Sequence, residues 1–271
     1  MAQKRIAKDV QTSAMRYGRM ALNMALIVAS VSAQNAVAAG PPAGLLRKIA
    51  ERESANAEAM NNYTYRQSVT VQEINDHGAV AGEYREVRDI TFSPKHVRYE
   101  QMSGQPRNTL AHIKMTPVDF EDIRNVEPFL LTKDKIFLYE AQYKGEETIN
   151  GDLCWLEHVR PKQIFSGHRF FEGMLWVRES DFSVVKTEGQ GVPQIETLRE
   201  QNLTPHFTTF RKLVDGKWFF PIETYADDTL YFRDWPQRLR IEIRYLDYKK
   251  FGAESTIIFN GGEQPQQSPD R

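Results

Sequence analysis

The sequence is poor in cysteine and has no long apolar run, and each absence excludes a class of protein. Its 271 residues include one cysteine, Cys154, so no intramolecular disulfide bond can form and a large packed core must hold the fold together. No apolar run reaches the roughly 20 residues that a membrane-spanning helix needs. Cys154 itself lies inside an apolar stretch, where we expect a buried and unreactive thiol.

An excess of charge of either sign is also missing. The chain has 35 Lys and Arg against 36 Asp and Glu, and residues 1–39 hold five of the basic residues and one of the acidic ones. The remainder carries 30 basic and 35 acidic residues, which is a mildly acidic balance. Because nucleic acids and anionic membrane surfaces select basic proteins, this balance argues against both as partners.

The first 39 residues have the organisation of a secretory signal peptide. A basic leader precedes an apolar run at residues 20–31, and small residues follow it. This order predicts export and cleavage between residues 33 and 39, after Ala33, Ala38 or Ala39. The alternative, an uncleaved membrane anchor, needs a longer apolar run. No cysteine follows the run to accept a lipid, so we expect a free periplasmic protein with no transmembrane segment in the mature chain.

Motifs for catalysis and for cofactor or metal binding are missing from the sequence. No Gly-x-Ser-x-Gly elbow, phosphate-binding loop or dinucleotide fingerprint occurs, and the six histidines never form His-Glu-x-x-His. We therefore expect no enzyme activity, no cofactor and no metal site. Two weaker alternatives stay open. His158 and His168 could meet across neighbouring predicted strands, and Asp227 with Asp228 could bind a cation or act as acid and base in a hydrolase.

Alternating apolar and polar residues dominate the chain from Tyr63 to Phe251 and predict antiparallel strands. The clearest signal is a hairpin at residues 170–191, whose apolar arms flank a polar turn and whose second arm is expected to end at Gly189 and Gly191. We predict further strands at residues 63–72, 84–92, 96–100, 135–143, 153–159, 207–214, 218–227 and 239–245. The chain is therefore mainly an antiparallel sheet.

Two helices and a single domain complete the expected organisation. An amphipathic stripe predicts a helix at residues 44–60, and Thr116 as N-cap before Pro117 predicts a short helix at 117–125. We expect one domain at residues 40–259. The Gly-, Gln- and Pro-rich tail at residues 260–271 cannot bury a core and is expected to be disordered.

One face of the predicted sheet collects apolar side chains. Alternation assigns seven residues to this inward face: Tyr65, Val69, Val71, Trp176, Ile241, Ile243 and Tyr245. The assignment is firm for the last strand and weaker for Trp176, because its neighbours Leu175 and Val177 are apolar as well. These side chains either fill a core or line a ligand cavity. The stability of Ile243→Ala distinguishes the two interpretations. In a filled core the substitution opens a void and lowers stability more than it would on a cavity wall.

Four stretches of the chain resemble the outer-membrane lipoprotein-sorting (LolA-like) superfamily. They are the helix at 44–60 with the strand Tyr63-Thr64-Tyr65-Arg66-Gln67 after it, residues 150–162, the hairpin arms 175–177 and 184–188, and the closing strands around Phe207, Phe220-Pro221 and residues 245–251. The resemblance spans about residues 44–252 and is a pattern of apolar strands. It implies an α+β, mainly antiparallel fold: an open, incomplete β-barrel, or curved sheet, with helices covering an apolar cavity.

The resemblance also implies a function. It suggests an exported periplasmic carrier or binding protein for lipid, lipoprotein acyl chains or another hydrophobic ligand, which is held in the apolar cavity without catalysis. The seven inward-facing residues would line that cavity, and burial of the ligand's apolar surface would supply the affinity. The alternative is an envelope sensor or assembly protein that docks a protein partner with the same fold. The identity of the ligand and the direction of transfer stay open.

Overall fold

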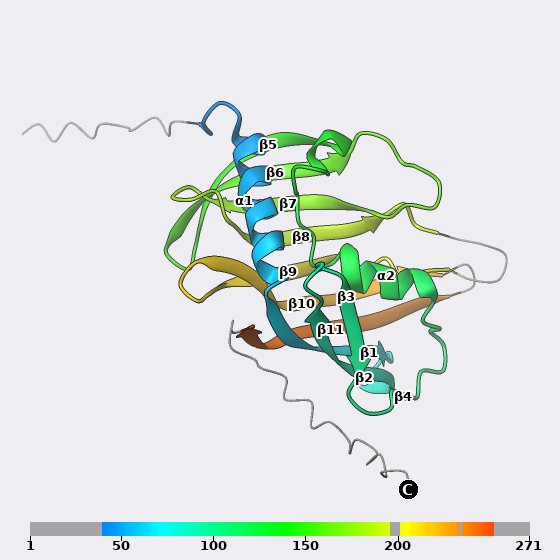
Figure 1. Cartoon of the computed structure of the whole chain (residues 1–271). Helices are drawn as coiled ribbons and strands as arrows, with labels where there is room; N and C mark the ends of the chain where they lie inside the picture. The colour runs from blue at the N-terminus through cyan, green and yellow to red at the C-terminus, as the bar shows by residue number, and fades with distance from the viewer. Residues whose placement is uncertain (1–39, 196–200, 233–234, 252–271) are drawn as a thin grey trace, which may run out of the picture. The chain divides into compact units, whose positions relative to one another are not determined.

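The computed structural model describes residues 40–195, 201–232 and 235–251 (Figure 1). Its elements in chain order are α1 (Leu45–Met60), β1 (Tyr63–Ile74), β2 (Val80–Phe92), β3 (Arg98–Met102), β4 (Arg107–Asn108), α2 (Pro117–Asn125), the 3-10 turn η1 (Ile136–Leu138), β5 (Tyr139–Ile149), β6 (Asp152–Pro161), β7 (Phe170–Arg178), β8 (Val184–Val192), β9 (Phe207–Val214), β10 (Trp218–Tyr231) and β11 (Pro236–Lys250). The predicted signal peptide and the predicted disordered tail lie outside the described residues. The domain boundaries stay predictions.

The strands form one antiparallel sheet. Their order across it is β3, β2, β1, β11, β10, β9, β8, β7, β6 and β5, and β4 also pairs with β2. The last strand, β11, therefore lies between β1 and β10. The two edge strands, β3 and β5, do not pair with each other, so the sheet is curved but unclosed (Figure 1). This is the open, incomplete barrel that the resemblance to the superfamily implied.

Both helices lie on the same face of this sheet (Figure 1). The helix α1 packs on it with an apolar stripe that includes Leu45 and Ile49, and with two buried polar residues, Glu53 and Asn56. Glu53 Oε2 accepts a hydrogen bond from Arg211 Nη1 on β9 at 2.7 Å, and both side chains are fully buried. The helix is thus fixed to the sheet by a desolvated ion pair as well as by apolar contacts.

The short helix α2 begins and ends where the sequence predicts. Thr116 Oγ1 accepts from Asp119 N at 3.3 Å, and Asp119 Oδ2 accepts from Thr116 N at 2.6 Å, so the two residues form a capping box. Asp119 Oδ1 also accepts from Leu203 N at 2.6 Å. The cap therefore fixes the helix to the chain segment that leads into β9.

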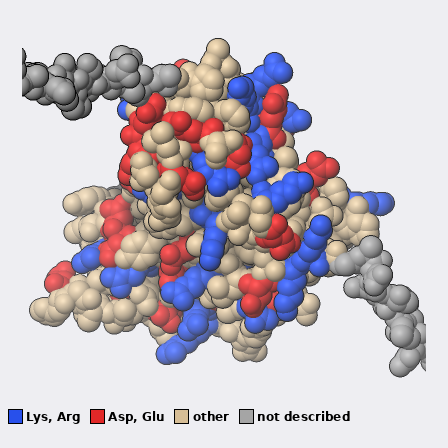
Figure 2. Space-filling view, turned by 90° about the vertical axis from the view of Figure 1, so that its left-hand side faces the viewer, with Lys and Arg blue, Asp and Glu red and all other residues tan. Residues whose placement is uncertain are grey.

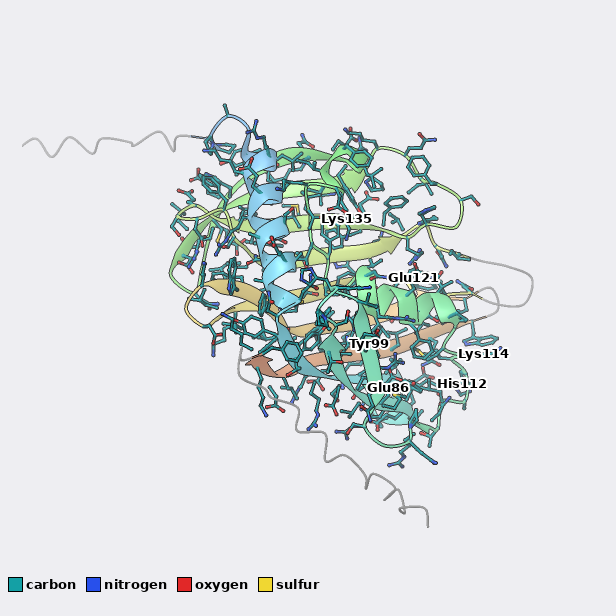
Figure 3. The ribbon with its side chains drawn as sticks, viewed as in Figure 1. Glu86, Tyr99, His112, Lys114, Glu121 and Lys135 are labelled. Carbon is teal, nitrogen blue, oxygen red and sulfur yellow. The ribbon has the colours of Figure 1, made fainter. Side chains whose placement is uncertain are left out.

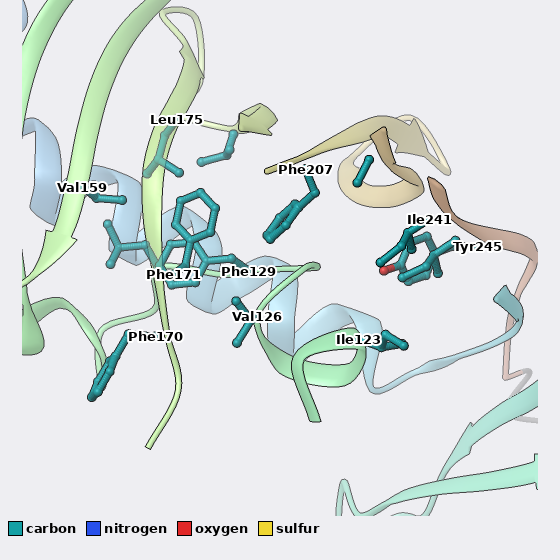
Figure 4. Packing of buried hydrophobic residues seen from close by; sticks show 14 of the residues in the cluster. Ile123, Val126, Phe129, Val159, Phe170, Phe171, Leu175, Phe207, Ile241 and Tyr245 are labelled. Carbon is teal, nitrogen blue, oxygen red and sulfur yellow. The ribbon is translucent and has the colours of Figure 1, made fainter. Parts of the chain in front are cut away.

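The main core lies between the sheet and the elements on its inner face, which are α1, α2 and the segment that follows α2. Phe129 in this segment stacks on Phe171 of β7, with ring centroids 4.7 Å apart, and Phe171 also contacts Phe207 of β9 at 5.9 Å (Figure 4). The paired glycines Gly173 and Gly189 lie beside Phe171, where a Cβ on Gly173 would approach its ring to 2.8 Å. Glycine is needed here because side chains would collide with the ring and with the partner strand.

Several sequence-based strand boundaries are wrong, and the strands β2, β10 and β11 are longer than predicted. The strand β8 does not end at Gly189 and Gly191 but continues through both to Val192. Gly189 lets the backbone of β7 approach closely and Gly191 makes room for the side chains of Arg169 and Asp122, so neither glycine forms a turn. The expected strand at 135–143 begins with the 3-10 turn η1, since the amides of Lys135 and Ile136 both donate to Thr132 O. Residues 136–138 are all apolar, as in a buried strand, so the sequence pattern does not reveal the turn.

Charged side chains of both signs are intermingled on the face shown in Figure 2. The helices in the described part of the chain are too short or too polar to cross a bilayer.

Candidate functional site

Two β-bulges shape one corner of the sheet, near the end of α1. On β11, Asp247 adopts a φ of 58°, and residues 247–248 together lie opposite the single residue Tyr65 of β1. On β10, Ile222 is the additional residue opposite β9. A bulge shifts the alternation of side chains along a strand by one residue. Tyr245 and Tyr248, three residues apart, can therefore both lie on the inner face beside Tyr65.

A pocket of about 190 Å³ lies over these three tyrosines, and we call it the tyrosine pocket. Its walls come from the end of α1, from the end of α2 and the segment between α2 and β5, and from the facing ends of β2 and β3. The lining residues are Ala57, Met60, Asn61, Tyr65, Phe92, Arg98, Arg124, Asn125, Pro128, Leu130, Lys135, Pro221, Tyr245 and Tyr248. Segments from both ends of the described chain thus meet at this site.

The floor of the tyrosine pocket is aromatic. The ring centroid of Tyr65 lies 5.1 Å from that of Tyr248 and 6.3 Å from that of Tyr245. The hydroxyl of Tyr248 donates to Pro221 O at 2.8 Å. Burial raises the pKa of all three phenols, so they stay protonated and neutral at physiological pH. The floor therefore offers apolar area with a few neutral polar atoms, a surface suited to hydrocarbon.

The rim of the pocket is cationic. Arg98, Arg124 and Lys135 line it, and no carboxylate is among the described lining residues. Arg98 Nε lies 2.9 Å from Glu100 Oε1, and Arg124 Nε lies 4.0 Å from the same oxygen. Arg88, outside the pocket, pairs with Glu100 as well. Because three guanidinium groups share this carboxylate, the rim keeps a positive excess.

The seven residues predicted to line a cavity separate into three groups. Tyr65 and Tyr245 line the tyrosine pocket. Val69, Val71, Ile241 and Ile243 are buried in the main core and pack against other side chains. Trp176 lies in a different apolar cluster with Cys154, Val185 and Phe219, and its Nε1 donates to Glu147 Oε2 at 2.7 Å. Trp176 does not share the inward face because its neighbours Leu175 and Val177 occupy it.

Sequence reasoning missed several lining residues. Strict alternation places Tyr248 on the opposite face from Tyr245, and only the bulge at Asp247 brings the two together. Lys135 was assigned to a strand, whereas the turn at η1 directs the chain past the pocket. An aromatic residue three positions after another at a strand end is a weak signal of such a bulge.

Buried polar groups lie beneath the segment that walls the pocket. Thr209 Oγ1 donates to Glu127 O at 2.7 Å and lies 2.8 Å from Thr224 Oγ1, which is 3.5 Å from the hydroxyl of Tyr245. The carboxyl of Glu127 is buried, and its Oε2 has no hydrogen-bond partner among the described residues. Burial, aided by Asp122 and Asp119, raises the pKa of Glu127 to about 8. The side chain is therefore a neutral acid at physiological pH.

The alternative catalytic and metal candidates have structural partners. Asp227 pairs with Arg238 at 2.7 Å and with Arg240 at 3.1 Å, and these guanidinium groups hold its pKa below the usual range. Asp228 instead accepts from His206 N at 3.0 Å. His158 lies opposite Gln142 and Met174 on the adjacent strands. Within residues 40–195, 201–232 and 235–251, no group of three or more His, Cys, Asp and Glu could hold a metal ion.

The thiol of Cys154 is fully buried, as expected from its apolar surroundings. Burial raises its pKa to about 11, which keeps it protonated and unreactive at physiological pH.

Comparison with known proteins yields matches to solved structures alone. No protein-family model matches the chain, and no curated protein sequence matches it. The chain is similar to the structure of a DUF1329 family protein from Desulfovibrio piger, with 13% identity and a TM-score of 0.37 over 74% of this chain and 92% of that chain.

Two further solved structures are similar at comparable identity. A LolA superfamily protein from Nitrosomonas europaea matches with 12% identity and a TM-score of 0.33 over 75% of this chain and 94% of that chain. The lipoprotein LppX from Mycobacterium tuberculosis matches with 10% identity and a TM-score of 0.25 over 75% and 94%. The open antiparallel sheet of this chain, with helices on one face, is the architecture that the resemblance in sequence implied.

Proposed function

We propose that this chain is an exported periplasmic protein that binds a lipid, a lipoprotein acyl chain or another hydrophobic ligand in the tyrosine pocket, without catalysis. The observation that carries the proposal is the floor of Tyr65, Tyr245 and Tyr248 under the end of α1. It is a concavity with an aromatic, largely apolar floor next to the packed main core. The bulges in β10 and β11 produce it, and bulges commonly aim side chains at binding sites.

The size of the pocket limits how much of a ligand it can bury. A water molecule takes up about 30 Å³ in the liquid, and a methylene group is of similar size, so about 190 Å³ accommodates about six such groups. At about 0.8 kcal/mol for each buried methylene, six contribute about 5 kcal/mol before the costs of association. The pocket in this conformation therefore takes a short hydrophobic molecule or one end of a longer chain.

A blocked pocket tests the proposal. Ala57 lines the pocket from α1, so Ala57→Phe should fill it with a ring while leaving the helix intact. Binding is measured with N-phenyl-1-naphthylamine, a neutral probe that fluoresces in apolar sites, and by its displacement with decanol. We expect Ala57→Phe to lower the affinity for the probe at least about tenfold, since most of the space for six methylene-sized groups is lost.

Ala55→Phe is the matched control, because Ala55 lies on the same helix but does not line the pocket. It should bind the probe like the wild type, and both variants should unfold at a similar temperature. If Ala57→Phe folds normally and still binds as tightly, the tyrosine pocket is not the site. If the wild-type protein binds neither the probe nor decanol, the proposed function is wrong.

Export is tested separately by cell fractionation and by mass spectrometry of the intact protein. The proposal requires the protein in the periplasmic fraction, with a mass that corresponds to cleavage between residues 33 and 39. A full-length chain in the cytoplasmic fraction would contradict it.

A further inference from the structure

Lys135 differs from the other charged groups around the tyrosine pocket. It precedes η1 in the segment between α2 and β5, where its amide donates to Thr132 O at 3.0 Å and fixes the local turn. Its side chain lines the pocket from beside α1 (Figure 3). The residue is partly buried, and burial lowers the pKa of its ammonium group.

The ammonium group of Lys135 has no hydrogen bond or ion pair within the described part of the chain, although two carboxylates lie near enough to affect its pKa. Glu53, the buried one of the two, is already paired with Arg211 and accepts from Asn56 Nδ2. Asp134, the other, is exposed. A desolvated ammonium without a partner is unfavourable, and an anion brought into the pocket would relieve that cost.

The other two cations of the rim are less available. Arg98 and Arg124 are both beside Glu100, and Arg124 Nε also donates to Phe120 O at 3.0 Å. Glu100 therefore compensates part of their charge, whereas Lys135 is the rim cation that has no paired carboxylate in the described part of the chain. The apolar floor lies next to this charge and would receive the rest of the molecule.

We propose that the ligand of the tyrosine pocket is a hydrophobic molecule with a singly charged carboxylate head, which Lys135 Nζ binds while the adjoining hydrocarbon lies over Tyr65, Tyr245 and Tyr248. This inference rests on the proposed function and adds the chemical class of the ligand. A carboxylate matches the single free ammonium in charge, and its oxygens accept the hydrogen bonds that the ammonium donates.

Two ligands that differ in the head group test the inference. Decanoate and decanol have the same chain, and the affinity of each is measured at pH 7 by displacement of N-phenyl-1-naphthylamine. Lys135→Met removes the charge and keeps a linear apolar side chain. We expect Lys135→Met to lower the affinity for decanoate at least about tenfold, because a charge-assisted hydrogen bond is lost. The affinity for decanol should change by less than about twofold.

Lys133→Met is the matched control, since Lys133 is exposed, lies two residues away and does not line the pocket; it should leave both affinities unchanged. Lys135→Arg, which retains the charge, should restore most of the affinity for decanoate. An equal loss for decanoate and decanol in Lys135→Met would mean a structural role and overturn the inference, as would unchanged binding of decanoate. If the wild type binds neither ligand nor the probe, the proposed function fails as well.

Discussion

Glu127 is an acid whose protonation the fold controls through burial. Its carboxyl group lies in the core beneath the pocket wall, and no cation pairs with it among the described residues. Its pKa is raised from 4.5 to about 8, chiefly by burial. Asp119 and Glu157 are shifted in the same direction, to about 6 and about 7, so several buried acids respond to pH alike.

We predict that Glu127→Gln reduces the pH dependence of stability. At a pH below 4.5, the carboxyl is protonated in both the folded and the unfolded chain. As the pH rises towards 8, the unfolded chain releases the proton first, so the wild type becomes less stable. The free energy of unfolding of the variant, relative to that of the wild type, should rise by about 2–4 kcal/mol between pH 5 and pH 8, since each pKa unit corresponds to about 1.4 kcal/mol. Urea unfolding at both values measures this, and a pH-independent difference would contradict it.

Ile243 illustrates the difference between a core residue and a pocket residue. Its side chain is fully buried in the main core, and it does not line the tyrosine pocket, whereas Tyr245 two positions later does. We predict that Ile243→Ala lowers the free energy of unfolding by about 2–5 kcal/mol, because a void opens among packed side chains. Affinity for the neutral probe should stay within about twofold. Chemical unfolding and probe titration of the same sample measure the two quantities. A loss of probe binding with little loss of stability would contradict the core assignment and show that Ile243 lines the cavity.

The end of α1 forms one wall of the pocket, and the ion pair between Glu53 and Arg211 helps to attach this helix to the sheet. Arg211→Met should destabilise the protein by about 3–5 kcal/mol, because it leaves the carboxylate of Glu53 buried without its partner. Adding Glu53→Leu should recover most of this loss, since an apolar pair can replace a buried ion pair.

The matched control for this cycle is an exposed pair of the same kind. Arg66 pairs with Asp89 at 2.9 Å on the surface. Arg66→Met should therefore lower the free energy of unfolding by less than about 1 kcal/mol. Thermal unfolding of the wild type, Arg211→Met, Glu53→Leu and the double variant measures the cycle, and Arg66→Met is unfolded beside them. Additive losses in the double variant would show that the two buried charges do not act as a unit.

At the scale of the whole molecule, the sequence predicts what local rules determine. Alternation identifies most of the strands, and the cap at Thr116 predicts α2 with correct ends. The architecture of an open sheet also follows from the sequence, through the resemblance to a superfamily.

The pocket could not be predicted in the same way, because it depends on contacts between distant segments. The bulge at Asp247 shifts the alternation beyond Tyr245, so Tyr248 joins an inner face that strict alternation denies it. The side chains of Ala57, Lys135 and Tyr248 come together only when α1, the segment before β5 and the end of β11 pack at one corner. The assignment of Trp176 was wrong for a different reason. Leu175, Trp176 and Val177 are all apolar, so alternation alone does not say which of them lie on the inner face of the strand.

The central claim is that a hydrophobic ligand lies over Tyr65, Tyr245 and Tyr248, and NMR spectroscopy of the tyrosine rings tests it most directly. The chain has 11 tyrosines, so ring-labelled protein gives a resolvable set of signals that can be assigned by single Tyr→Phe variants. Titration with decanol should shift the ring signals of these three residues most strongly. Tyr99 and Tyr231, which are exposed and do not line the pocket, should not respond. Saturable binding of decanol that leaves the three rings unperturbed would contradict the account.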